Sequence, residues 1–109
     1  MKKVMLIGDS IRLSYQAKVA ELLSDRAIVT GPEENCRFSA YTLFNLTSWV
    51  QEDDYDVIQW NNGQWDTSHM PDGKIHTPLQ TYLELQEHCH HPPQKDQATC
   101  LCDYHPRMA

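Results

Sequence analysis

A serine with a possible catalytic role follows the first short apolar run of the chain. Val4-Met5-Leu6-Ile7 is followed by Gly8, Asp9 and Ser10, and then by a helix-like pattern. A strand that gives way to a helix here would put Ser10 at the carboxyl end of the strand. Ligands bind at that edge of open α/β sheets, and a helix N-terminus favours developing negative charge. Ser10 is therefore a candidate nucleophile; the alternative is a helix cap, because Ser and Asp are both preferred there.

Two asparagines follow a later apolar stretch at 55–60, which reads as a strand. If that strand is parallel to the first, Asn61 and Asn62 lie at the same edge of the sheet as Ser10. Ester hydrolysis by a serine needs a nucleophile, a base and donors for the oxyanion. A neutral carboxamide is a suitable donor, and removing such a donor costs about 10²–10³ in rate. We expect the Ser10 N–H and Asn61, or in second place Asn62, to hold the oxyanion; the alternative is that the asparagines only form a turn.

The elements that would position these residues follow from the apolar pattern. Apolar residues recur every three or four positions after Ser10, which predicts a helix with one face on a sheet. Gly31 and Pro32 end a second short strand, completing a right-handed βαβ unit. A later helix is expected to bury Tyr41, Leu43, Phe44, Leu46, Trp49 and Val50. The pattern predicts one α/β domain with a parallel sheet: strands at 4–7, 27–29 and 55–60, and helices at 11–24, at 39–51 and from an N-cap at Thr77 with Pro78 in first position.

The residues around Ser10 resemble a known family. Gly8-Asp9-Ser10-Ile11, just after an N-terminal strand, is similar to the first block of the SGNH (GDSL-type) hydrolases, which are serine esterases and lipases. The stretch 60–66, WNNGQWD, resembles the third block of a subgroup that reads W/F-N-x-G-L-x-D, with Gln64 at the leucine position. In the commoner form, G-x-N-D, Trp65 would take the place of the asparagine. The resemblance implies a three-layer α/β/α flavodoxin-like fold, hydrolysis of small acyl or carbohydrate-linked esters, and no cofactor or metal.

The family's second block resembles residues 34–39 by its place in the chain. A backbone N–H there usually completes the oxyanion hole, and because the usual glycine is missing, Cys36 or Arg37 would offer it. Arg37 could instead hold a substrate carboxylate. The Cys36 thiol is expected to be a small buried hydrophobe rather than a nucleophile.

The family takes its base from a C-terminal D-x-x-H block, but the tail here reads Asp103-Tyr104-His105, one residue too short. The catalytic His and Asp are therefore expected to be missing. His69 and His76 are expected to be surface residues.

The composition excludes several classes of function. The chain has 109 residues and a formal charge of −6, which argues against binding nucleic acid or an anionic membrane. No apolar run resembles a membrane span or a signal peptide, so a cytoplasmic protein with a small-molecule ester substrate is expected. The oligomeric state stays open. One rival is a non-catalytic flavodoxin-like module that binds an anionic small molecule. The other is a metal-binding protein, although Cys100-Leu101-Cys102 is too tight for the usual zinc spacing.

The last part of the chain, 84–109, differs in character from the rest. It is polar, carries paired prolines and four histidines, and is predicted to have no strand. We expect residues 1–83 to form the N-terminal half of a family domain and 84–109 to be a non-family tail. A one-base frameshift near Leu83 would explain this tail, as would disorder. The chain is then expected to be an incomplete, weakly active or inactive fragment.

Overall fold

The chain forms a four-stranded parallel sheet with strand order β2-β1-β3-β4. The computed structural model describes residues 1–50, 55–89 and 99–104, with Cys89 and the last segment described by their backbone. Its elements are β1 (Lys2–Ile7), α1 (Ser10–Leu22), β2 (Ala27–Thr30), α2 (Ser39–Trp49), β3 (Val57–Asn62), α3 (Leu79–Cys89) and β4 (Thr99–Tyr104).

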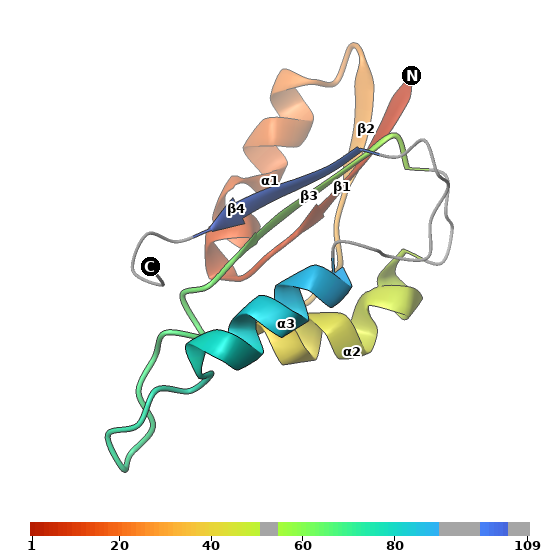
Figure 1. Ribbon diagram of the computed structural model, residues 1–109. Helices are drawn as coiled ribbons and strands as arrows, with labels where there is room; N and C mark the ends of the chain where they lie inside the picture. Colours follow the sequence, from red (N-terminus) through yellow and green to blue (C-terminus); the bar gives the residue numbers. More distant parts are fainter. Residues whose placement is uncertain (51–54, 90–98, 105–109) are drawn as a thin grey trace.

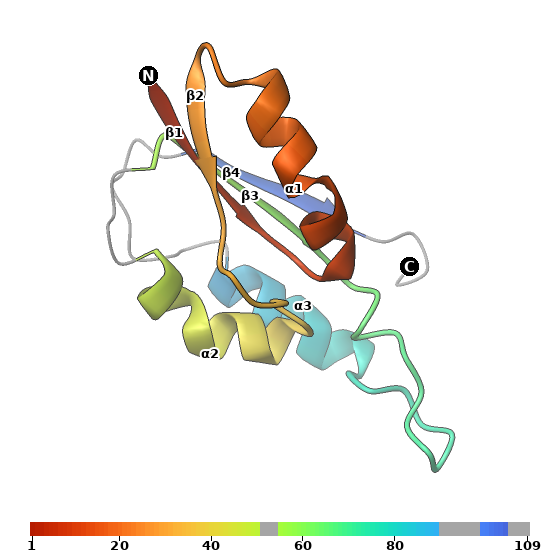
Figure 2. The same cartoon turned by 180° about the vertical axis from the view of Figure 1, so that it is seen from behind.

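The helices cover both faces of this sheet. Helix α1 lies on one face, whereas α2 and α3 lie side by side on the other (Figures 1 and 2). The predicted α/β fold with a parallel sheet and three α/β/α layers is confirmed. The order and type of the first six elements also match the sequence prediction, with boundaries that differ by a few residues. Helix α3, for example, begins at Leu79, because the Pro78 carbonyl accepts the Tyr82 N–H.

The segment after Leu83 differs from the prediction. Helix α3 continues through this position to Cys89, and the backbone of 99–104 forms β4, which pairs in parallel with β3. The register runs from Val57 opposite Thr99 to Asn62 opposite Tyr104. The expectation of no strand was wrong because TCLCDY combines a β-branched residue, apolar residues and an aromatic, a composition that suits a strand. The frameshift hypothesis stays a prediction.

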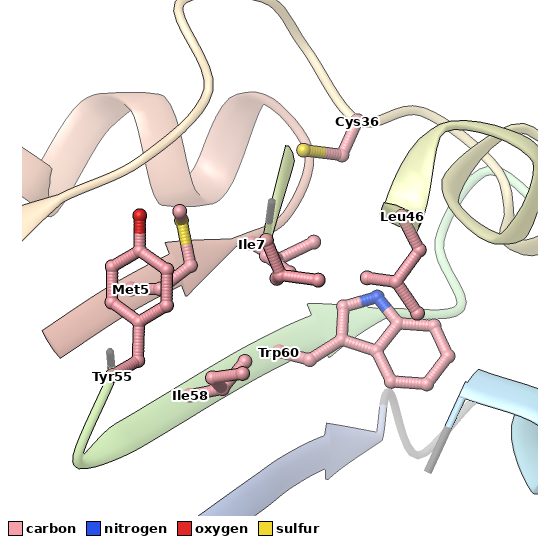
Figure 3. Close-up of a cluster of buried hydrophobic side chains, with 8 residues drawn as sticks. Met5, Ile7, Cys36, Leu46, Tyr55, Ile58 and Trp60 are labelled. Carbon is pink, nitrogen blue, oxygen red and sulfur yellow. The ribbon is translucent and has the colours of Figure 1, made fainter. Parts of the chain in front are cut away.

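The main hydrophobic core lies between the sheet and α2. Strands β1 and β3 are central in the sheet and are rich in buried apolar residues, as expected for parallel strands covered on both faces. Figure 3 shows Trp60 of β3 beside Leu46 of α2, with Ile7 between Trp60 and Cys36. The cluster consists of Met5, Ile7, Cys36, Leu46, Val50, Tyr55, Ile58 and Trp60.

Two predicted helix faces need correction. In α2, Phe44 was expected to be buried but is 86% exposed, whereas Leu46 is 5% exposed. In α1, Leu13 and Leu22 are exposed, and the buried residue of the helix is Arg12. The face of α1 toward the loop after β2 meets main-chain carbonyls, which a guanidinium can satisfy and a leucine cannot.

Candidate active site

Ser10 is the first residue of α1 and is free of the capping role. The cap is Asp9, whose Oδ1 accepts the backbone N–H of Ile11 at 3.0 Å. Asp9 is buried, whereas Ser10 is exposed. The Ser10 side chain therefore faces solvent at the start of the helix, where backbone N–H groups have no partner within the helix.

A pocket of about 280 Å³ opens beside Ser10. Besides Ser10 and Asp9 it is lined by three residues of the loop between β3 and α3: Gln64, Trp65 and Ser68. The loop starts at the carboxyl end of β3 and extends away from the body of the molecule (Figure 1). None of these three residues was predicted to line a site. Gln64 and Trp65 directly follow Asn62 and Gly63 at the same sheet edge as Ser10, and this position was their signal in the sequence.

Asn61 lies against the turn that carries Ser10. Its Nδ2 donates to Asp9 Oδ1 at 3.1 Å, and its Oδ1 accepts the Tyr15 hydroxyl at 3.3 Å. Gly8 permits this approach, because a methyl group there would overlap Asn61 Oδ1 and lie 2.7 Å from Arg12 Cβ. Asn61 is buried behind Asp9 and does not line the pocket.

Asn62 points away from Ser10. Successive side chains of a strand alternate between faces, and Asn62 turns to α3. Its Oδ1 accepts the Tyr82 hydroxyl and, at 2.9 Å, Gln86 Nε2. Of the two candidate asparagines, the structure brings Asn61 to the Ser10 turn.

Of the two residues predicted to offer a backbone N–H, Cys36 contacts the Ser10 turn, and neither Cys36 nor Arg37 lines its pocket. The Cys36 N–H donates to the Gly8 carbonyl at 3.0 Å, and the Arg37 N–H donates to Asn35 Oδ1 at 2.7 Å. Neither amide is directed at an oxyanion in this structure. Arg37 is held in the left-handed region at φ 57°, and its guanidinium lies 4.6 Å from the centre of the Tyr41 ring.

Cys36 is the buried hydrophobe that the sequence predicted. Its side chain has no exposure, and burial raises the pKa of the thiol above its ordinary value. A thiol that stays protonated is a poor nucleophile.

Arg12 joins the Ser10 turn to the loop that contains Cys36. Its Nε donates to the Gly8 carbonyl at 3.4 Å, and its Nη atoms donate to the carbonyls of Pro32 at 2.8 Å and Glu34 at 2.6 Å. The guanidinium is fully buried. Arg12 thus fixes two of the three loops at this edge of the sheet.

Asp66 fixes the third loop. Its carboxylate accepts the Ser39 hydroxyl at 2.9 Å and the Ser39 N–H at 3.2 Å, and its carbonyl accepts the Thr77 N–H at 3.1 Å. Gln86 of α3 donates to the same Ser39 hydroxyl. The start of the pocket loop is thereby tied to α2, and its end at Thr77 is tied back to Asp66.

The loop histidines do not line the Ser10 pocket. His69 is exposed, as expected, but His76 is half-buried, with its ring 4.6 Å from that of Phe38. Within residues 1–50 and 55–88, whose side chains are described, Asp9 is the only acidic or basic residue that lines this pocket. Its Oδ1 accepts hydrogen bonds from the Ile11 N–H and from Asn61 Nδ2.

This arrangement of sheet, helices and edge loops has a solved counterpart. The same fold is found in an esterase. The crystal structure of the acetyl xylan esterase AlAXEase matches this chain with a TM-score of 0.77 and 19% sequence identity. The match covers 92% of this chain and 56% of the esterase, so this chain spans little more than half of the length of that esterase. No family model matches the sequence, and no curated protein matches it either.

Neither a metal centre nor a membrane span is found in the described part of the chain. Its His, Cys, Asp and Glu side chains form no group of three or more that could hold a metal ion. The side chains of Cys89, Cys100 and Cys102 lie outside the described set. Among the described helices, none has the length and apolar character to cross a bilayer.

Proposed function

We propose that this chain carries the nucleophile of an SGNH-type serine ester hydrolase that acts on small acyl esters, including carbohydrate-linked ones. The proposal rests on one observation: Asp9, and not Ser10, forms the N-cap of α1. Asp9 caps α1, so the Ser10 hydroxyl is available at the helix start and opens into a pocket. The shared fold with an acetyl xylan esterase is consistent with this function.

The proposed reaction begins with attack of Ser10 Oγ on the acyl carbonyl carbon. The carbonyl oxygen becomes an oxyanion as the new C–O bond forms, and the hydroxyl proton leaves Ser10. Collapse of the intermediate breaks the bond to the alcohol, which takes up a proton, and water then hydrolyses the acyl-serine. The positive end of α1 lies where the negative charge develops.

We propose the Ser10 N–H as the oxyanion donor at the pocket and the Asn61 amide as a second donor, which reaches the oxyanion when Asp9 moves aside, because Asn61 is buried and does not line the pocket. An asparagine amide has two N–H groups, and Asp9 Oδ1 accepts one of them. Because no histidine lines the pocket among the described residues, solvent is the proton acceptor that exposed Ser10 can reach. We therefore propose a slow reaction for the chain as it stands, since removing triad members leaves only a residual rate.

Hydrolysis of p-nitrophenyl acetate tests this proposal. We expect slow release of p-nitrophenol above the buffer rate, abolished in Ser10→Ala and retained in Ser68→Ala. Ser68 is a matched control because it lines the same pocket but its hydroxyl donates to the Trp65 carbonyl within its own loop. Ser10→Ala leaves the Asp9 cap in place, so the fold is kept. Equal rates in Ser10→Ala and the parent chain would overturn the proposal.

A further inference from the structure

A group of aromatic rings adjoins the Ser10 pocket. Trp65, which lines the pocket, lies with its ring centre 6.2 Å from that of Phe38. Phe38 in turn contacts His76 at 4.6 Å and Tyr41 at 6.0 Å. We call Trp65, Phe38, His76 and Tyr41 the aromatic platform.

The platform is partly open to solvent. Trp65 is 37% exposed, and the other three rings are half-buried. Trp65, Phe38 and His76 do not belong to the buried cluster between the sheet and α2. Tyr41 adjoins that cluster through Trp49, with ring centres 6.1 Å apart, and the Arg37 guanidinium lies over its ring.

The platform is also held in place before any ligand binds. Three of its members immediately precede residues of the Asp66 network: Phe38 precedes Ser39, Trp65 precedes Asp66, and His76 precedes Thr77. The Asp66 carboxylate binds Ser39, and its carbonyl binds the Thr77 N–H. One buried residue therefore gathers three rings from two separate loops, and such preorganisation lowers the entropy lost on binding.

The chemistry of the surface fits a neutral sugar. A pyranose has faces of C–H groups and a rim of hydroxyls, and the negative face of an aromatic ring attracts polarised C–H groups. The Gln64 carboxamide lines the adjoining pocket and can bind the hydroxyl rim. A long lipid chain would instead need a longer apolar wall than a pocket of about 280 Å³ with one aromatic residue provides.

We infer that the aromatic platform, led by Trp65, binds the sugar part of a carbohydrate-linked ester, while the pocket beside Ser10 receives a small acyl group. This inference rests on the proposed esterase function and deepens it. It assigns Trp65 as the residue that selects the alcohol half of the substrate. The pocket, at about 280 Å³, lies just below the usual range for ligand sites, which suits a small acyl group.

Binding of an unesterified sugar separates the inference from the catalytic proposal. The probe is xylotetraose, added to the full chain with Ser10→Ala, so that no hydrolysis is required. We expect the Trp65 indole N–H signal in a ¹H–¹⁵N NMR spectrum, assigned by its absence in Trp65→Phe, to shift on titration. Trp65→Phe keeps a ring and should retain binding, whereas Trp65→Leu should weaken it by about tenfold.

Phe44→Leu is the matched control, because Phe44 is an exposed aromatic of α2 and is in none of the ring pairs found among the described side chains. Circular dichroism of Trp65→Leu checks that the fold is kept. Equal xylotetraose affinity in Trp65→Leu and its parent, an equal loss in Phe44→Leu, or no binding at all would overturn the inference. Sugar binding without Ser10-dependent hydrolysis would overturn only the proposed function, and hydrolysis without sugar binding only the inference.

Discussion

Arg12 is a buried charged side chain bound by main-chain carbonyls rather than by a carboxylate. Its guanidinium donates to the carbonyls of Gly8, Pro32 and Glu34. Charge-assisted hydrogen bonds of this kind are stronger than neutral ones. A buried arginine therefore connects the nucleophile turn to the following loop, which explains why α1 buries this residue and leaves its leucines at the surface.

Arg12→Met is expected to destabilise the chain strongly. The substitution leaves buried carbonyls without a donor, and each unsatisfied group costs roughly 1–3 kcal/mol, so we expect a total loss of about 3 kcal/mol. Urea unfolding followed by circular dichroism measures it. Arg26→Met is the control, because Arg26 forms only an exposed pair with Asp25. Similar unfolding midpoints for the two variants would contradict the assigned role.

The Cys36 thiol makes stability fall at alkaline pH. Burial raises its pKa in the folded state, so above the ordinary thiol pKa of about 8.5 the unfolded chain loses this proton first. Its contribution to the free energy of unfolding is complete below that pH and is lost as the pH rises through the folded-state pKa. We expect the stability difference between the parent and Cys36→Ala to shrink between about pH 8 and 10. A constant difference in urea unfolding across this range would refute the assignment.

Helix α2 separates buried from exposed positions within one turn. Leu46 packs in the core beside Trp60 (Figure 3). Phe44 is exposed to solvent. Leu46→Ala should therefore cost about 2–5 kcal/mol, and Phe44→Ala should stay within about 0.5 kcal/mol of the parent. Thermal unfolding of both variants checks the expectation. A larger loss for Phe44→Ala would mean that α2 presents a different face to the sheet.

The sequence predicted the helices and strands wherever local signals determine them. It did not predict which face of each helix is buried. Glycine, proline and apolar spacing marked β1, α1, β2 and α2 with small errors at the ends. Whether Phe44 is buried depends on how far α3 and the sheet extend over α2, and spacing within α2 carries no such information. The identity of Arg12 likewise gave no sign that carbonyls twenty residues away would surround it.

The candidate site was predictable in part for the same reason. Ser10 follows β1 and Asn61 lies at the carboxyl end of β3, and the order of strands alone brings these ends together. Gln64 and Trp65 reach the pocket through the path of a long loop, which Asp66 fixes by binding Ser39, a residue 27 positions away. A contact over this distance in sequence leaves no local signal. The base, the oxyanion role of Asn61 and the frameshift stay predictions.

The strands of the sheet are expected to differ in their protection from hydrogen exchange. Among the described strands, β1 and β3 have a neighbour on each side, whereas β2 pairs only with β1. Ile28 of β2 is accordingly exposed. An edge strand opens more readily than a central one, so the amides of β3 should exchange with deuterium more slowly than those of β2. Hydrogen exchange followed by NMR measures this, and equal rates would contradict the pairing of β3 with β4.

The central claim is that Ser10 is a nucleophile. The most direct measurement is reaction of the full chain with a fluorophosphonate, followed by mass spectrometry of the intact protein and its peptides. The account predicts a single adduct on Ser10 that is lost in Ser10→Ala and kept in Ser68→Ala. An unmodified chain, or an adduct that survives in Ser10→Ala, would contradict it.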